Sequence, residues 1–281
     1  MSALLELASV TKYFGGLCAV SDVSLAIKKN AIFGLIGPNG AGKTTVFNLI
    51  TGVYKTDKGT IRLGATDLLP LRPSAIARAG IARTFQNIRL FGQLSVLENL
   101  LVAGELTKKA GIFSAVMRSR HHHADEDLHL AEARSLLEVF ELGDKADDAS
   151  TSLSYGNQRK LEIARAMMLK PKVLLLDEPA AGMNYGEAEG LKKQIRWLRD
   201  TFDLTVVLVE HNMQVVMGVC DEIQVLDHGE PIAYGTPEQI RTDEKVLAAY
   251  LGDESLAMGQ GTDVPAVELP VKDPNAPEAH S

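Results

Sequence analysis

The chain has 281 residues, of which 46% are hydrophobic and 23% charged, with a formal net charge of -7. This composition excludes collagen-like, wholly disordered and disulfide-stapled proteins, and its two cysteines, Cys18 and Cys220, favour a reducing compartment. No apolar run approaches the roughly 20 residues of a membrane helix. The first residues also lack the charged-then-apolar pattern of a signal peptide. We therefore expect a cytosolic globular protein.

The first 70 residues alternate in the manner of β-strands. Glycine, asparagine and aspartate separate four predicted strands, at residues 4–10, 18–27, 31–36 and 59–63. A glycine-rich segment follows the third of these strands and leads into an apolar-periodic stretch at residues 46–51. This order predicts a strand, a glycine loop and a helix.

Residues from about 88 to 170 carry apolar side chains at three- and four-residue steps, the spacing of helices. The predicted helices span residues 96–106, 124–140 and 161–169. Between the first two lie a stretch of little periodicity and then three consecutive histidines, His121 to His123. On a helix they would point in different directions, and no cysteine or acid precedes them at ligand spacing. We therefore expect a solvent-exposed loop there.

Strands and helices alternate through the C-terminal half of the chain. The predicted strands are residues 173–176, 205–209, 222–226 and 231–234, and the predicted helices are residues 186–202, 213–220, 237–242 and 243–250. Such alternation predicts an α/β fold with a parallel sheet.

The acidic balance of the chain is concentrated at its C-terminal end. Residues 253–281 hold six acids and one base, so they carry -5 of the net charge of -7. They also hold four of the 11 prolines and no aromatic residue. A segment of this composition cannot easily bury a core. We therefore expect a disordered tail after a nearly neutral folded domain at residues 1–252.

The glycine-rich segment after the third strand fits the pattern GxxxxGK[ST]. The backbone N–H groups of such a loop cradle phosphate oxygens, and the helix that follows points its positive end at the same anion. Lys43 is expected to reach the β- and γ-phosphates, and the Thr44 hydroxyl to bind Mg²⁺. The predicted nucleotide-binding residues are Gly37, Pro38, Asn39, Gly40, Ala41, Gly42, Lys43, Thr44 and Thr45.

Two acids end the apolar strand at residues 173–176. Ligands of parallel α/β sheets bind at the carboxyl ends of the strands. We expect Asp177 to hold Mg²⁺ through a water, and Glu178 to act as the general base that polarises the attacking water. Together with the phosphate loop, these acids predict Mg-dependent nucleotide hydrolysis.

Another predicted anion site lies more than 100 residues beyond the phosphate loop, where Ser154 and Gly156 precede a helix. Two phosphate sites this far apart suggest a nucleotide shared between two copies. The segment LSYGNQ resembles the LSGGQ signature of ABC-family ATPases, with Tyr155 at the third position and Asn157 in place of glutamine. By this resemblance Ser154, Gly156 and Asn157 contact the ATP held by the other subunit.

The resemblance covers about residues 4–252. It implies a P-loop NTPase fold of the ABC type, with an N-terminal antiparallel β subdomain and a helical subdomain at about residues 88–170. It also implies that Phe14 stacks on adenine, that Gln86 touches Mg²⁺ or water and moves with a transmembrane partner, and that His211 contacts the γ-phosphate. Asn184 stands where the family's D-loop ends in aspartate.

The chain resembles a stand-alone transporter subunit, because it has one cassette and no long heptads. Translation-type members of the family carry two cassettes, and repair-type members carry long coiled coils. The implied partners are two transmembrane permease subunits, a second ATPase subunit (itself or a paralogue) in a head-to-tail dimer, and indirectly an extracytoplasmic binding protein, with no nucleic acid. The implied place is the cytoplasmic face of the inner membrane. The dock for the permease is expected at residues 86 to about 100.

Finer features resemble the larger ATPase of branched-chain (hydrophobic) amino acid importers. These features include the segments IARTFQN, PAAGMN and VEHNM, the ending AYLG and a long insertion at about residues 104–130. ATPases of urea or amide importers and of the lipopolysaccharide exporter share much of this pattern and remain alternatives. A soluble ABC ATPase that remodels a macromolecule is another, and a P-loop kinase is disfavoured by the signature segment.

Overall fold

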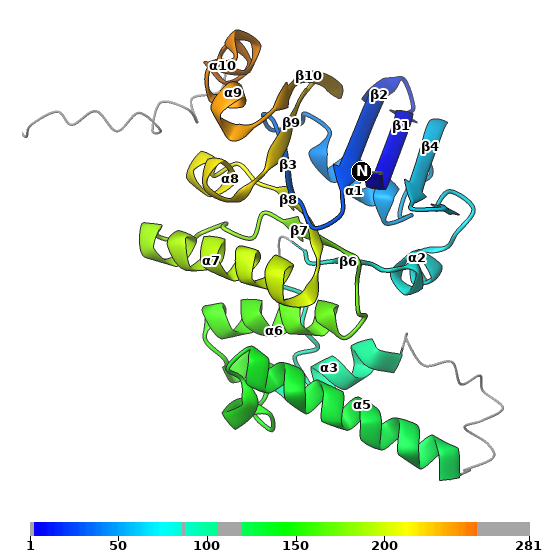
Figure 1. The fold of residues 1–281 in the computed structure, drawn as a ribbon, viewed down its shortest axis with the longest axis vertical. Coiled ribbons are helices and arrows are strands. Elements are labelled where there is room, and N and C mark those ends of the chain that lie inside the picture. The colour runs from blue at the N-terminus through cyan, green and yellow to red at the C-terminus, as the bar shows by residue number, and fades with distance from the viewer. Residues whose placement is uncertain (1–2, 86–87, 106–119, 252–281) are drawn as a thin grey trace, which may run out of the picture.

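The computed structural model describes residues 3–85, 88–105 and 120–251, and Figure 1 shows two sheets with helices around them. Gln86 and the predicted disordered tail, residues 253–281, lie outside this range. Helices α3, α5 and α6 gather at one end of the molecule and the smaller sheet at the other (Figure 1). Both cysteines are free thiols, as expected for a reducing compartment.

The smaller sheet is antiparallel and contains the first two predicted strands. Its order is β2-β1-β4-β5, with β1 at Ala3–Phe14, β2 at Leu17–Lys28, β4 at Lys58–Leu63 and β5 at Thr66–Asp67. β1 continues to Phe14, beyond its predicted end, because the tight turn at Gly15 (φ 57°) returns the chain into β2. The expected N-terminal antiparallel subdomain is confirmed.

The larger sheet has six strands in the order β10-β9-β3-β8-β7-β6. Neighbouring strands from β9 to β6 are parallel, and β10 pairs antiparallel with β9 at one edge. The bounds are β3 Ile32–Ile36, β6 Ile81–Arg83, β7 Val173–Asp177, β8 Thr205–Val209, β9 Glu222–Asp227 and β10 Glu230–Gly235. The predicted parallel sheet is confirmed; β5 and β6 were not anticipated, because two and three residues show no readable alternation.

The strands β3, β7 and β8 of the larger sheet are buried on both faces, and their side chains alternate between two hydrophobic clusters. In β7, Leu174 and Leu176 join one cluster with the helical subdomain, while Val173 and Leu175 join the other with the smaller sheet. Such strands read as continuous apolar runs, because neither face is solvated.

The helices are α1 Lys43–Ile50, α2 Pro73–Ala79, α3 Val96–Gly104, α5 Arg120–Val139, α6 Tyr155–Met167, α7 Tyr185–Phe202, α8 Met213–Val219, α9 Pro237–Arg241 and α10 Glu244–Leu251, with single 3₁₀ turns at Gly143–Lys145 and Ser150–Ser152. α2 was not anticipated, although Pro73 at its first position and Gly80 (φ 115°) after its end are both helix boundary signals.

Three sequence-based expectations in the helical subdomain are corrected. Residues 88–95 are not helical, although residues from about 88 were expected to be. The signature helix begins at Tyr155 rather than near residue 160, because Ser154 caps it. His121 to His123 lie in α5 and not in a loop; their side chains are outside the described set.

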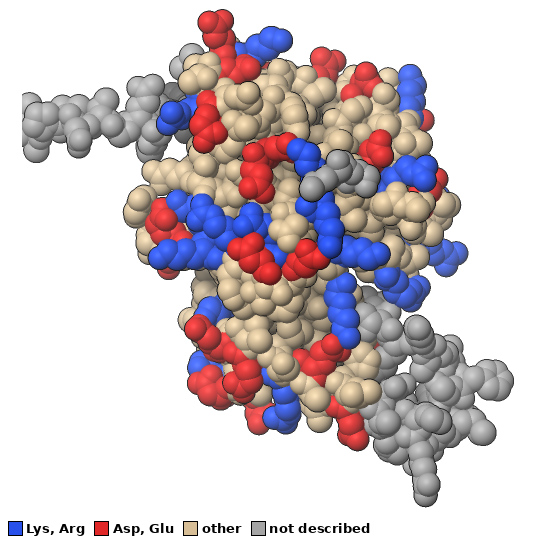
Figure 2. All heavy atoms as spheres, viewed as in Figure 1, with Lys and Arg blue, Asp and Glu red and all other residues tan. Residues whose placement is uncertain are grey.

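Charged side chains of both signs are scattered over the face of the molecule shown in Figure 2. Figure 2 shows a band of Lys and Arg across the middle of one face, with Asp and Glu interspersed. Ion pairs such as Lys28–Glu222, at 2.7 Å, neutralise part of the basic charge. This mixture agrees with the near-neutral charge of residues 1–252.

Candidate nucleotide site

The glycine loop lies between β3 and α1, as the sequence predicted. Gly37 has φ 150°, and a Cβ there would lie 2.0 Å from the carbonyl oxygen of Leu226. Gly42 has φ 96°, and a Cβ there would lie 2.5 Å from the carbonyl oxygen of Ala19. Only glycine fits at either position, so backbone sterics impose the spacing of the motif.

Lys43 is folded into this loop. Its Nζ donates hydrogen bonds to the carbonyl oxygens of Gly37, at 2.7 Å, and Pro38, at 2.8 Å. The residue is only 7% exposed, and it opens α1, whose N-terminal end carries a partial positive charge. The ammonium group is therefore fixed where an anion would meet both it and the helix end.

A cavity of about 460 Å³ opens over the loop, a volume within the usual range for small-molecule sites. It is lined by Phe14, Leu17, Cys18, Ala19, Asn39, Gly40, Ala41, Gly42, Lys43, Thr44, Thr45, Glu178 and His228. The structure therefore brings together most of the predicted loop residues with Phe14 and Glu178. Leu17, Cys18, Ala19 and His228 were not anticipated, because no sequence signal connects these turns to the loop.

Phe14 occupies the rim of this cavity. Its ring contacts Tyr54 edge-on at a centroid distance of 5.1 Å, and Lys12 Nζ lies 5.5 Å from its centroid. The residue remains 39% exposed. These contacts fix an aromatic ring that is still accessible from the cavity, an arrangement suited to stacking on a planar base.

Asp177 and Glu178 follow one another but have different environments. Asp177 ends β7 and is 5% exposed, and its Oδ2 accepts a 2.7 Å hydrogen bond from Arg83 Nη2. Glu178 has φ 46°, which is uncommon outside glycine, and its N–H donates to the carbonyl oxygen of Val209 at 2.8 Å. This turn directs Glu178 into the cavity and leaves Asp177 in the protein interior.

His211 lies beside Glu178, at the carboxyl end of the neighbouring strand β8. Its Nδ1 is 3.7 Å from Glu178 Oε2, and its side chain is 59% exposed. Two residues separated by 33 positions in the sequence are thus brought together.

Glu210, which sequence reasoning missed, anchors both loops beneath this pair. Its fully buried carboxylate accepts hydrogen bonds from the N–H groups of Ala180 at 2.6 Å, His211 at 3.0 Å and Asn212 at 3.0 Å. Burial raises the pKa of the Glu210 carboxyl above its ordinary value, although these N–H groups act in the opposite direction. The one sequence signal for a buried role of Glu210 was its position, because it directly follows the apolar strand β8.

Replacement of Glu210 by alanine should lower both stability and turnover. Three N–H groups, of which that of Ala180 is buried, would lose their acceptor, so we expect the free energy of unfolding to fall by about 3 kcal/mol in urea denaturation. ATP turnover should fall as well, because the loop carrying His211 loses its anchor. Glu189→Ala, which breaks a surface ion pair with Lys192, is the matched control and should change stability by at most about 1 kcal/mol. Equal effects of the two substitutions would contradict this role of Glu210.

The signature segment does not join the cavity of its own chain. Ser154 is exposed and caps α6 by accepting a 3.4 Å hydrogen bond from the N–H of Asn157. Gly156 is exposed too, with open space where a Cβ would lie. None of these three residues lines the cavity over the glycine loop. The N-terminus of α6 therefore lies outside the lining of the nucleotide cavity of the same subunit.

Asn184, the departure from the D-loop pattern, has a local role. It caps α7: its Oδ1 accepts from the N–H of Glu187 at 3.0 Å, and its own N–H donates to Glu187 Oε2 at 2.8 Å. Asparagine and aspartate are equally good at this position. The substitution therefore retains the helix start while it removes a charge.

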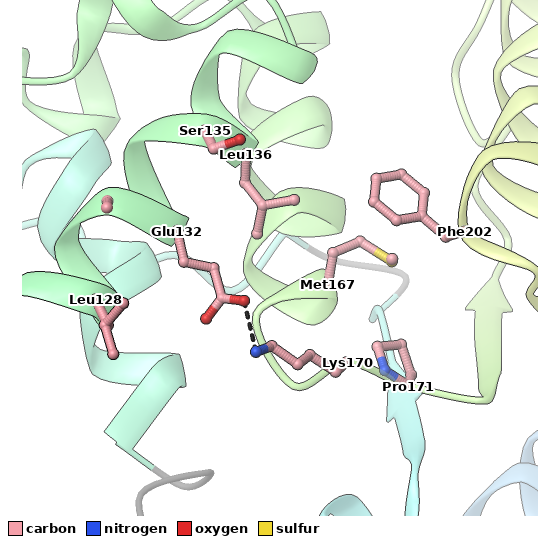
Figure 3. Close-up of a pocket in the computed structure, with 9 residues that line it drawn as sticks. Leu128, Glu132, Ser135, Leu136, Met167, Lys170, Pro171 and Phe202 are labelled. Atoms are coloured by element: carbon pink, nitrogen blue, oxygen red, sulfur yellow. Dashed lines mark ion pairs between the residues drawn. The ribbon is translucent and has the colours of Figure 1, made fainter. Parts of the chain in front are cut away.

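A larger cavity, of about 750 Å³, lies elsewhere, between α5 and the ends of α6 and α7 (Figure 3). It is lined by Leu128, Ala131, Glu132, Ser135, Leu136, Met167, Lys170, Pro171 and Phe202. The ion pair between Glu132 and Lys170, at 2.6 Å, lies across it. None of the predicted site residues is among these, so this cavity is separate from the nucleotide site.

Comparison with known protein families gives two matches. The model described as ABC transporter matches residues 20–181, and the model described as branched-chain amino acid ATP-binding cassette transporter matches residues 230–255. The first covers more than half of the chain, including the glycine loop, the signature segment and both acids. Within the described residues, no helix is long and apolar enough to cross a membrane.

Individual relatives agree with these matches. The chain is 46% identical to the high-affinity branched-chain amino acid transport ATP-binding protein LivG of Salmonella typhimurium, over 89% of this chain and 98% of that one. It is 36% identical to the lipopolysaccharide export system ATP-binding protein LptB of Escherichia coli, over 90% and 98%. The crystal structure of MJ1267, an ATP-binding cassette of an ABC transporter in its ADP conformation, superposes with a TM-score of 0.77 at 30% identity, covering 90% of this chain and all of that one. The chain therefore belongs to the ABC transporter family.

Proposed function

We propose that this chain is the ATP-hydrolysing subunit of an ABC importer for branched-chain or other hydrophobic amino acids. The observation that supports hydrolysis best is the single cavity that joins the glycine loop, Phe14 and Glu178. The greater identity to LivG than to LptB favours amino acid import over lipopolysaccharide export. The family model at residues 230–255 favours the same substrate class.

The donor set fits Mg²⁺. Thr44 is exposed and lines the cavity, and Asp177 ends β7 with a carboxylate directly before Glu178, which lines the same cavity. Hard oxygen donors of this kind suit Mg²⁺, which is commonly held by one or two protein groups together with phosphate oxygens and waters. Bound with ATP, Mg²⁺ would neutralise charge on the β- and γ-phosphates.

The side chains of the site divide the work of hydrolysis. Lys43 and the loop N–H groups bind the phosphates, and Phe14 orients the nucleotide by stacking on its base. Glu178 accepts a proton from the attacking water, while His211 contacts the γ-phosphate. Gln86, which lies outside the described residues, would touch Mg²⁺ or its water and relay closure to the membrane subunits.

The site requires a second subunit for completion. Ser154, Gly156 and Asn157 lie away from the cavity of their own chain, at an exposed helix N-terminus. A head-to-tail dimer would place this end over the partner's bound ATP, whose phosphates would then be held from both sides. The second subunit is a copy of this chain or a paralogue.

The proposed dock for the permease lies on residues 86 to about 100, of which the structure describes 88–100, and includes an exposed aromatic side chain. Phe91 is 49% exposed, yet its backbone is held firmly. The fully buried Asn99 exchanges hydrogen bonds with the Phe91 N–H, at 2.9 Å, and carbonyl, at 3.2 Å, and Ser150 Oγ donates to the same carbonyl at 3.0 Å. A rigidly presented aromatic ring suits contact with a membrane subunit at the cytoplasmic face.

Reconstitution tests this function. The chain should co-purify with two permease subunits, and their ATP turnover in liposomes should rise several-fold on addition of a binding protein loaded with leucine, isoleucine or valine. Stimulation by an amide or by lipopolysaccharide instead would assign the chain to one of the alternative transporters. Purification of the chain without any membrane partner would favour a soluble ABC ATPase.

A further inference from the structure

Arg83, at the end of β6, is a buried cation next to the proposed magnesium residue. Its side chain is 8% exposed. Its Nη2 donates to Asp177 Oδ2 and its Nη1 to Asn48 Oδ1, both at 2.7 Å. The two terminal nitrogens of one planar group thus join β7 to α1, the helix that follows the glycine loop. A single ammonium point charge could not reach both acceptors in the same fork geometry.

Two aromatic rings hold the guanidinium in place. Its Cζ lies 5.5 Å from the ring centroid of Phe47 and 5.3 Å from that of Phe85. Phe47 is fully buried in α1, and Phe85 is the last described residue before Gln86. The Arg83 guanidinium therefore has little freedom to rotate, and its hydrogen bond restricts the orientation of the Asp177 carboxylate.

The consequence for Asp177 is that its two oxygens differ. Oδ2 is engaged by Arg83, whereas Oδ1 has no hydrogen-bond partner among the residues that the structure describes. The carboxylate would otherwise rotate about its Cβ–Cγ bond and exchange the two oxygens. The contact with Arg83 prevents this exchange and reserves one defined oxygen for a ligand.

We propose that Arg83 is a positioning residue, which orients Asp177 so that a single oxygen is presented to Mg²⁺ or to one of its waters. This inference rests on the proposed function, since it assumes that the nucleotide binds with Mg²⁺. Arg83 itself touches neither nucleotide nor metal. Its effect passes through Asp177 and should disappear when that carboxylate is absent.

Arg83→Lys tests this proposal, because it keeps the positive charge and removes the fork. Binding of a fluorescent ATP analogue is measured as Mg²⁺ is titrated, in the full chain carrying Glu178→Gln so that turnover does not interfere. We expect the Mg²⁺ concentration at half-saturation to rise about tenfold. A change of this size corresponds to the loss of roughly one charge-assisted hydrogen bond. Affinity in EDTA should stay within about twofold, since the loop and Phe14 bind the nucleotide without Asp177.

A double-mutant cycle distinguishes an effect of Arg83 that passes through Asp177 from a general disturbance of the fold. Asp177→Asn alone should also raise the Mg²⁺ requirement, and Arg83→Lys added to it should produce no further change. The matched control is Arg199→Lys. Arg199 Nε donates to Asp200 Oδ1 at 2.7 Å and lies outside the nucleotide cavity, so the Mg²⁺ midpoint of this variant should equal that of the parent.

Asn48→Ala keeps the test decisive should Arg83→Lys fail to fold. It removes the other acceptor of the fork and should raise the Mg²⁺ midpoint in the same direction by a smaller factor. An unchanged midpoint in the folded Arg83→Lys protein, or a full additional effect in the Asp177→Asn background, would overturn the proposal. If the parent protein itself binds nucleotide with no Mg²⁺ dependence, the proposed function fails first, and Arg83 then positions nothing for the metal.

Discussion

Replacement of Glu178 by glutamine is expected to abolish ATP turnover and to leave ATP binding intact. Glutamine has nearly the same shape as glutamate, but its amide cannot accept a proton from the attacking water. Removal of a general base lowers rates by about 10²- to 10⁴-fold. The measurement is phosphate release by the wild-type and variant proteins at saturating ATP, beside equilibrium binding of a labelled ATP.

The environment of Glu178 should keep the surrounding structure unchanged by this substitution. Its backbone is fixed by the hydrogen bond to Val209, and its side chain is largely buried next to His211, so the amide should occupy the same place. Glu187→Gln, in the first turn of α7, is a control carboxylate outside the cavity and should keep normal turnover. Wild-type turnover in the Glu178→Gln protein would eliminate Glu178 as the base.

Replacement of Lys43 by methionine should have the next largest effect, on nucleotide affinity. Methionine retains the length and the apolar stem of lysine but carries no charge. Two charge-assisted contacts to phosphate oxygens would be lost, and we expect the Kd for ATP to rise about 100-fold. Isothermal titration with ATP measures this change directly.

Two comparisons make the result specific. Lys193→Met removes an exposed lysine of α7 and should leave the Kd unchanged. Adenosine, which has no phosphate, should bind wild type and Lys43→Met equally, because only the contact of Phe14 with its base is used. An equal loss of adenosine and ATP affinity would mean that the substitution has deformed the glycine loop.

Much of the nucleotide site was predictable because its signals are local. The glycines at positions 37 and 42 belong to one short motif, although the carbonyl oxygens that require them are those of Leu226 and Ala19, and the strand before Asp177 is apolar along its full length. Each of these features is visible within about ten residues of sequence. The same holds for Ser154, whose capping role needs only the helix that follows it.

Other parts depend on residues that are distant in the chain. The role of Arg83 can be recognised only from its contact with Asp177, 94 positions away in the chain. The role of Glu210 likewise depends on its contact with Ala180, 30 positions away. A buried charge has no periodicity that distinguishes it from a surface charge until its partner is located. Strand β6 was missed for a related reason, because three residues gain their strand identity from pairing with β7 and not from their own pattern.

The two buried faces of the strands β3, β7 and β8 have a consequence for how the molecule opens. Amide protons of β3, β7 and β8, covered on both sides by separate apolar clusters, should exchange with solvent only when the whole domain unfolds. Gly37, Glu178 and Glu210 lie just beyond the ends of these strands, where the backbone leaves that protected layer. The residues proposed to bind and hydrolyse ATP are therefore attached directly to the part of the molecule that we expect to exchange most slowly.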